Sequence, residues 1–491
     1  MNIWKIFLSG GLIGLLLCSA LMLIVLYRLS PMLQSRRQRS MRDQHTEPVP
    51  RFGGIALFWG FIVALSLMWW FPFEQRGFNL HSLSDNRLAG LILGGLLAWG
   101  IGFADDIFCL RARWKLAGQT GVAVLAIGLG FELQTIHVPF FQSFSLGLWS
   151  WPLTAFWIVG VMNAFNLIDG LDGLSSGLTI VALAFLATLC WWQDQNALLL
   201  LILVLLGTTL GFWTFNRPPA SIFMGDSGSL FLGYSLAVLS LWATEIPGEG
   251  QTILPLLILA IPILDTSFAL FRRLLKGIPF YSADKDHLQH RLIAKGFSPP
   301  QAMWFLVGTS VLFSGLALFA HHETNHQGFA YLGGVIMAYM LLYWLEYDVI
   351  RNPFISLFGQ NDHRKRRNLM LALGDLIDGF LAKDPDRESI IRSFHYWTEL
   401  AGVSRIEVCL KNSVIWQSGP KDDSHQILLF RQGVWEVRLA LPELSWKIDS
   451  DVKGDLLERV SLALMKRLEQ LESPHVVHSF NSRKNAEKNR T

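Results

Sequence analysis

Long apolar segments follow one another along the first 350 residues, separated by short polar connections. A helix that crosses the hydrocarbon core of a bilayer needs about 17–25 mostly apolar residues. Segments of this kind occur at 6–27, 54–73, 88–104, 116–132, 149–165, 177–192, 197–215, 229–245, 252–271, 301–320 and 328–347. The pattern therefore predicts an all-α polytopic membrane protein with about eleven transmembrane helices in a domain over residues 1–348.

Positive charges gather in alternate connections between these segments. Arg36, Arg37, Arg111, Arg113 and Arg272 represent the first, third and ninth connections, which are rich in arginine and lysine. The even-numbered connections carry almost none, and the exceptions are Arg76 and Arg87. Because positively charged loops stay on the cytoplasmic side, we expect the N-terminus outside and the odd loops and the C-terminus inside.

The chain changes character after Tyr347. A basic linker is expected at 349–367, and a helical pattern follows at 368–383. Short alternating segments then predict strands, and a closing helix completes a soluble α+β domain over 368–472 that resembles a GAF module in pattern. The expected strands are 404–410, 413–417, 425–430 and 434–440, and the closing helix is 453–472. The pattern does not indicate a role for this domain, and the basic tail 473–491 is predicted to be disordered.

Composition agrees with a membrane protein and excludes several other classes. Apolar residues make up 52% and charged residues 16% of the chain, and the net charge of +3 gives no reason to expect nucleic acid as a partner. The four cysteines are scattered without metal-type spacing, which argues against a zinc site or a disulfide framework.

Two acidic motifs interrupt the apolar pattern. Asp105 and Asp106 end the third predicted span and are followed by Lys115 and Gln119. Adjacent carboxylates at that position could hold Mg²⁺ or accept a proton, although a solvated turn would explain them as well. The block 163–175 contains Asn163, Asn166, Asp169 and Asp172 together with two glycines. The first three are three residues apart, so we expect them to share one helical face at the inner membrane surface.

Two further motifs contain groups suited to phosphate. Asn216 leads to the segment Gly225-Asp226-Ser227-Gly228-Ser229, which precedes an apolar span. Backbone N–H groups at such a helix N-terminus suit a phosphate, and Asp226 beside it would require a bridging cation. A capped helix start would explain the same residues. In the ninth connection, His287, His290 and Arg291 offer donors to a pyrophosphate, or they form a solvent-facing loop.

All four motifs map to the same side of the membrane. Paired carboxylates, a phosphate cradle and a His/Arg loop gathered there predict metal-assisted phosphoryl transfer at the cytoplasmic interface. A transporter or a membrane-embedded sensor is the alternative. A transporter should carry ionisable residues near the middle of the bilayer, where only Asp265 lies. A buried polar contact between helices would explain Asp265 as well.

These residues resemble the polyprenyl-phosphate N-acetylhexosamine-1-phosphate transferases, over about residues 1–345. The resemblance rests on Pro50-Arg51-Phe52-Gly53-Gly54, on Asp105-Asp106 with Lys115 and Gln119, on the block 163–173, on 225–229 and on 287–291. It implies eleven spans in the branch that initiates glycan synthesis, such as the undecaprenyl-phosphate N-acetylglucosamine-1-phosphate transferases.

The resemblance also implies roles for individual residues. Asp226 becomes the leading Mg²⁺ ligand, with Mn²⁺ as a substitute for the metal, and Asp105, Asp106 and Asp169 are further candidate ligands. The candidate catalytic residues are Asp105, Asp106, Asp169 and Asp172, and the candidate substrate-binding residues are Arg51, Lys115, Asn163, Asn166, Asn216, His287, His290 and Arg291. Gln289 departs from the family, which often has histidine there, so a proton-carrying role is in doubt at this position.

The implied reaction moves N-acetylhexosamine 1-phosphate from a UDP-sugar, first of all UDP-N-acetylglucosamine, to undecaprenyl phosphate and releases UMP. A modified N-acetylhexosamine is the second choice of donor. The implied location is the bacterial inner membrane, with the active site on the cytoplasmic side. The product would start a cell-surface polysaccharide such as O-antigen, and a homodimer is considered as well.

Overall fold

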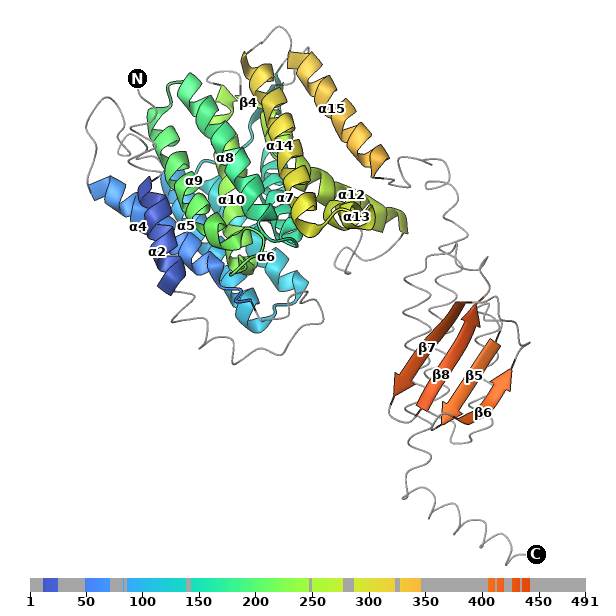
Figure 1. Cartoon of the computed structure of the whole chain (residues 1–491). Helices are drawn as coiled ribbons and strands as arrows, with labels where there is room; N and C mark the ends of the chain where they lie inside the picture. The colour runs from blue at the N-terminus through green and yellow to red at the C-terminus, as the bar shows by residue number, and fades with distance from the viewer. Residues whose placement is uncertain are drawn as a thin grey trace, which may run out of the picture. The chain divides into compact units, whose positions relative to one another are not determined.

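The computed structural model describes two separate units of the chain, Met1–Arg351 and Asn352–Thr491. The residues that it describes are 12–24, 49–70, 83, 86–137, 143–246, 250–276, 287–322, 327–345, 405–410, 413–418, 426–432 and 435–441. Figure 1 shows a helical N-terminal unit and a C-terminal unit with a sheet.

Helices dominate the N-terminal unit, and each predicted apolar segment contains at least one of them. They are α2 (Leu12–Ile24), α4 (Gly53–Trp70), α5 (Asn86–Phe108), α6 (Ala112–Gly128), α7 (Ser150–Ile168), α8 (Leu174–Trp192), α9 (Asn196–Asn216), α10 (Gly225–Ala243), α11 (Leu254–Ile258), α12 (Ala260–Lys276), α13 (Leu288–Ala294), α14 (Pro299–His322) and α15 (Gln327–Trp344). Within the described residues, six helical segments are long and apolar enough to cross a membrane. The protein is thus a multi-pass membrane protein, and the number of eleven spans stays a prediction.

Helix α10 forms the centre of this unit, between α5, α7, α4 and α8 (Figure 1). Every residue of Ser227–Ala243 is buried. Glycine and serine are frequent on this helix, and small residues allow neighbouring backbones in a membrane bundle to approach closely. The buried hydroxyl of Tyr234 donates to the carbonyl oxygen of Gly90 in α5 at 2.7 Å, which satisfies a polar group that could not reach water.

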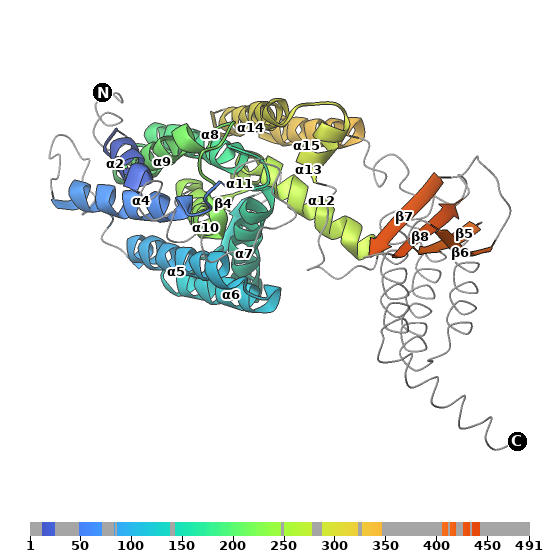
Figure 2. The same cartoon turned by 60° about the horizontal axis from the view of Figure 1, so that its bottom comes forward.

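The ninth predicted span is divided in the structure. The segment 252–271 was expected as one helix, but α11 ends at Ile258 and α12 begins at Ala260. Proline explains the break, because Pro262 lacks the N–H group that would continue the helix from Ile258. Figure 2 shows α12 running obliquely to α14 and α15.

Four short strands join connections at the end of the bundle where α5 begins, a feature that the all-α expectation did not include. Their order is β2 (Phe144–Ser145), β1 (Thr135–His137), β4 (Gly250–Thr252) and β3 (Glu245–Ile246), with β1 and β4 parallel and the outer pairs antiparallel. Nearby, Arg87 Nη1 lies 2.6 Å from Glu245 Oε2, and Arg87 Nε donates to the carbonyl of Gly130 at 3.1 Å. Arg87 is therefore balanced by a carboxylate, which accounts for one exception to the charge asymmetry.

The C-terminal unit contains an antiparallel sheet in the order β6 (Ser413–Ser418), β5 (Arg405–Leu410), β8 (Trp435–Leu441) and β7 (Gln426–Gln432). These strands agree with the four predicted segments to within two residues at each end. The predicted helices 368–383 and 453–472, the linker and the tail lie outside the described residues. The GAF-like arrangement accordingly stays a prediction.

Candidate active site

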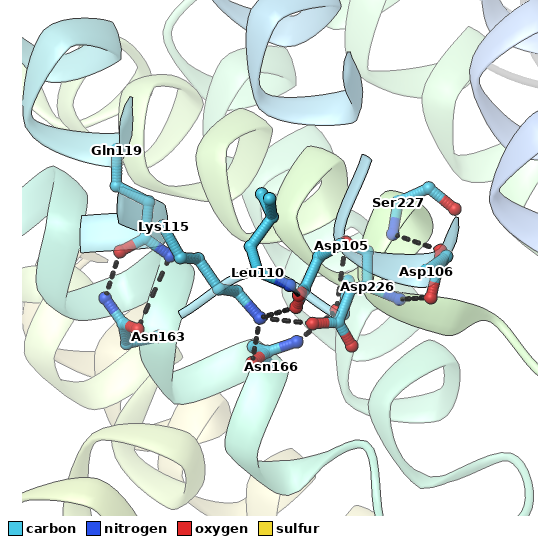
Figure 3. A network of polar contacts seen from close by, with 10 residues as sticks. Asp105, Asp106, Leu110, Lys115, Gln119, Asn163, Asn166, Asp226 and Ser227 are labelled. Atoms are coloured by element: carbon cyan, nitrogen blue, oxygen red, sulfur yellow. Dashed lines mark hydrogen bonds and ion pairs between the residues drawn. The ribbon is translucent and has the colours of Figure 1, made fainter. Parts of the chain in front are cut away.

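Four helix ends converge on one cluster of polar side chains. The cluster takes Asp105 and Asp106 from the end of α5, Lys115 from the start of α6, Asn166 from the end of α7 and Asp226 from the start of α10 (Figure 3). We call Asp105, Asp106, Asp169 and Asp226 the carboxylate cluster. Residues more than 100 positions apart in the sequence meet here because successive helices run in opposite directions.

Lys115 connects Asp105, Asn166 and Asp226. Its ammonium group lies 3.0 Å from Asp105 Oδ2 and 3.0 Å from Asn166 Oδ1, and it forms an ion pair with Asp226. The other oxygen of Asp105 accepts the backbone N–H of Leu110 at 2.7 Å, and the amide of Asn166 donates to the hydroxyl of Ser229 at 3.0 Å. One cation thus holds two carboxylates from different helices side by side, although their charges repel each other.

Asp106 caps helix α10 from outside that helix. Its two carboxylate oxygens accept the backbone N–H groups of Asp226 and Ser227, each at 3.0 Å (Figure 3). Only 7% of Asp106 is exposed. Gly225, with φ +73°, lets the chain turn into the helix directly beside this carboxylate.

This capping corrects an expectation from the sequence. The N–H groups at the start of α10 were expected to cradle a phosphate, but Asp106 binds two of them. A carboxylate suits the positive end of a helix for the same electrostatic reason as a phosphate does. Asp226 itself stays directed toward Lys115 rather than toward the helix end (Figure 3).

The two asparagines and the two aspartates of the block 163–175 have different surroundings. Asn163 donates to Gln119 Oε1 and to the carbonyl of Val159, both at 2.8 Å. The three-residue spacing predicted that Asp169 would share a helical face with Asn163 and Asn166, but α7 ends at Ile168, before Asp169. Asp172 accepts the backbone N–H of Ala220 at 2.9 Å and thereby holds the connection before α10.

Asp169 lies next to other negative charges. Burial, and after it the charges of Asp226 and Asp106, raise the pKa of its carboxyl group to about 8, while Arg51 acts in the opposite direction. Arg51 belongs to a segment whose backbone pairs with the connection before α10, since Phe223 N donates to Pro50 O at 2.8 Å and Gly53 N donates to Phe223 O at 3.0 Å. The sequence motif 50–54 is thus brought to the carboxylate cluster.

Asn216, which was predicted to bind substrate, has its amide hydrogen-bonded within the protein, and its role toward substrate stays a prediction. Its oxygen accepts the hydroxyl of Ser176 at 2.7 Å, and its nitrogen donates to the carbonyl of Ile222 at 3.0 Å. Both groups are buried, so Asn216 shapes the connection between α9 and α10.

The His/Arg motif begins and forms helix α13. His287 precedes the first helical residue, and Arg291 Nη1 donates to the carbonyl of Leu345 at the end of α15 at 3.0 Å. Gln289 is buried against Gly170, which follows Asp169 in the chain. Residues 284–286 lie outside the described residues. The sequence contained no signal for the contacts of Leu110, Ser229 and Gln289, because each depends on which helices are neighbours.

The cluster offers oxygen ligands that fit Mg²⁺. Within the described residues, no group of three or more His, Cys, Asp or Glu side chains is arranged to hold a metal ion. Mg²⁺ is nevertheless commonly held by one or two carboxylates together with phosphates and water. Asp226 and Asp105, both in contact with the ammonium group of Lys115, form such a pair.

Comparisons with known proteins show which family this chain resembles. The profile of the family described as glycosyl transferase family 4 matches residues 88–244, the part of the chain from α5 to α10. A probable undecaprenyl-phosphate N-acetylglucosaminyl 1-phosphate transferase of Bacillus subtilis (strain 168) is 37% identical over 279 residues, which are 56% of this chain and 75% of that protein.

Two further relatives extend the comparison. A decaprenyl-phosphate N-acetylglucosaminephosphotransferase of Mycobacterium leprae is 31% identical over 61% of this chain and 80% of its own length. An undecaprenyl-phosphate alpha-N-acetylglucosaminyl 1-phosphate transferase of Escherichia coli O157:H7 is 25% identical over 68% of this chain and 89% of its own length. With its helical bundle, its carboxylate cluster and these relatives, the chain belongs to glycosyl transferase family 4.

Proposed function

We propose that this protein transfers N-acetylglucosamine 1-phosphate from UDP-N-acetylglucosamine to undecaprenyl phosphate, with release of UMP. The observation that carries the proposal is the ion pair of Lys115 with Asp105 and Asp226 at one end of an apolar bundle. A lipid acceptor and a water-soluble donor can meet only at a membrane surface, and the cluster joins helix ends rather than helix middles. The names of the relatives support the same donor group and the same class of acceptor.

The reaction exchanges one phosphoanhydride bond for another. A phosphate oxygen of the lipid attacks the sugar-bearing phosphorus, and the bond from that phosphorus to the bridging oxygen of UMP breaks. The C1–O bond of the sugar is untouched, so the anomeric configuration is kept. Charge builds up on phosphate oxygens during transfer, and positively charged groups lower its energy.

Residues of the cluster divide this work. Asp226 and Asp105 would hold Mg²⁺, or Mn²⁺ in its place, and the bound ion would offset the charge of the donor's phosphates. Lys115 brings both carboxylates together, and Asp106 holds the helix end that carries Asp226. Arg51 and His287 supply donors toward phosphate, and Asn166 keeps Lys115 in place.

The proposed topology follows from the charge pattern. Eleven spans place the N-terminus outside and the carboxylate cluster and C-terminal unit in the cytoplasm of a bacterial inner membrane. The lipid-linked sugar would then form where UDP-sugars are available and would start a cell-surface polysaccharide. A homodimer is compatible with this arrangement.

The test is UMP release by the purified protein with UDP-N-acetylglucosamine, undecaprenyl phosphate and Mg²⁺. Asp226→Asn should lower kcat at least ~100-fold because it removes a carboxylate that would hold the Mg²⁺ acting on the transferred phosphate. EDTA should abolish the activity, and Mg²⁺ should restore it. Asp194→Asn is the matched control, since Asp194 is exposed at the opposite end of the bundle, between α8 and α9.

Other outcomes redirect the proposal. UMP release only with a modified UDP-N-acetylhexosamine would keep the reaction and change the donor. No lipid-dependent UMP with any UDP-N-acetylhexosamine would overturn the proposal and favour a transporter or a sensor.

A further inference from the structure

A buried carboxylate outside the cluster meets the first residue of the His/Arg motif. Asp265 of α12 lies with its Oδ2 2.8 Å from Nδ1 of His287. Asp265 is 2% exposed and His287 is 5% exposed, so water screens this contact very little. The two residues are 22 positions apart, and the break between α11 and α12 places Asp265 near the start of the oblique helix α12.

The second oxygen of Asp265 holds the start of α13. Oδ1 accepts the backbone N–H of Leu288, the first residue of that helix, at 2.7 Å. A carboxylate at this position also interacts favourably with the positive end of a helix. One side chain therefore fixes both the ring of His287 and the backbone that carries it.

Helix α13 also packs against the connection between α7 and α8, which carries Asp169 of the carboxylate cluster. A Cβ atom built on Gly170 would lie 2.2 Å from Nε2 of Gln289, so a larger residue at position 170 would displace the Gln289 side chain. Gly170 directly follows Asp169 in the chain. The helix whose start Asp265 holds thus packs against the segment that carries Asp169.

The Asp265 contact also selects one protonation form of the imidazole. An ionised carboxylate can only accept a hydrogen bond, so Nδ1 carries the hydrogen. Nε2 is then the nitrogen that can interact with groups other than Asp265. It accepts a hydrogen bond in the neutral ring and donates one in the charged ring. Histidines that act in catalysis or metal binding are commonly oriented by a carboxylate in this way.

We propose that Asp265 is a positioning residue for the phosphosugar transfer, which holds His287 with Nε2 directed to the donor's phosphates. The inference rests on the proposed function, because it assigns to Asp265 an effect on that reaction. Asp265 need not touch substrate itself, since both of its oxygens are used within the protein.

The first measurement is independent of catalysis. Nitrogen-15 NMR of the detergent-solubilised full chain, labelled at histidine, reports which ring nitrogen carries hydrogen. The chain has 13 histidines, and the His287 signals are those lost in His287→Asn. We expect His287 in the wild type to be protonated at Nδ1, and an Nδ1 without hydrogen would overturn the proposal. This measurement needs no substitution of Asp265.

The second measurement is a double-mutant cycle on UMP release. Asp265→Asn offers one acceptor oxygen to two donors, and we expect kcat to fall about 10- to 100-fold. His287→Asn keeps a donor toward Asp265 but lacks Nε2, and it should lose at least as much. The double variant should be no worse than His287→Asn alone, because Asp265 acts through the ring. Losses that multiply would overturn the proposal.

Thr266→Val provides the matched control. Thr266 follows Asp265 on α12 and is 8% exposed, and its hydroxyl has no hydrogen-bond partner within the described residues. The variant should keep wild-type kcat, and a loss equal to that of Asp265→Asn would attribute the effect to packing of α12 and overturn the proposal. If the wild type releases no UMP although His287 is protonated at Nδ1, the proposed function fails while the Asp265–His287 contact stands.

Discussion

Asp169 directly follows α7, and the charges of Asp226 and Asp106 in the cluster raise the pKa of its carboxyl group. Burial is the larger reason for its raised pKa of about 8, and the like charges come second. A carboxyl group in water loses its proton near pH 4. Around neutral pH, Asp169 is therefore mostly protonated in the folded protein without bound metal.

This pKa predicts a pH dependence of stability. Between about pH 4 and pH 8 the folded state binds a proton at Asp169 that the unfolded state has released, so stability falls as pH rises through this window. Asp169→Asn removes this dependence. In EDTA, the melting temperature of the wild type should fall relative to Asp169→Asn between pH 6 and pH 9. If the melting temperatures of the two proteins changed in parallel with pH across that range, the assignment would be contradicted.

Helix α10 carries Asp226 at its first turn, and its start is held by a carboxylate from α5. The capping residue thus lies 120 positions before Asp226 in the chain. In most helices a nearby Ser, Thr, Asp or Asn performs this function. Here the arrangement ties the position of Asp226 to the packing of α5 against α10.

Removal of this cap should weaken the fold near the cluster. Asp106→Asn leaves one acceptor for two buried N–H groups and removes the charge at the helix end, at a cost of about 1–3 kcal/mol. We expect a lower melting temperature, followed by intrinsic fluorescence in detergent. The same change at the exposed Asp194 should leave the melting temperature within error. Equal melting of Asp106→Asn and wild type would show that the cap contributes little.

The bundle as a whole has two unlike ends. One end carries the carboxylate cluster and the exposed Cys109, and the other carries the four-stranded sheet with Arg87 and Glu245. In a membrane these ends face different compartments. The charge pattern predicts that the end with Cys109 faces the cytoplasm.

A membrane-impermeant maleimide tests this orientation in a Cys409→Ser background. Cys109 should react only after the membrane is permeabilised, whereas Cys18 and Cys190 are buried and should stay unlabelled. Asp194→Cys, at the other end, should react in intact spheroplasts. Labelling of Cys109 in intact spheroplasts would reverse the proposed topology.

Much of this picture was predictable from sequence because it depends on local pattern. Each predicted apolar segment contains a helix, since a run of apolar residues has few other structures in a bilayer. The strands β5 to β8 follow from alternation of apolar and polar residues. Asp105, Lys115, Asn166 and Asp226 were recognised as polar exceptions in an apolar chain, and the structure brings them together.

The sequence by itself thus determined the membrane class, the helices and the residues that carry polar chemistry, because these depend on hydrophobicity and spacing along the chain. Tertiary structure decided which of those residues are bound to one another. Lys115 between two carboxylates, Asp106 on α10 and Asp265 on His287 all join segments far apart in sequence. Such contacts depend on which helices are neighbours and on how far each is rotated, and no local pattern contains that information.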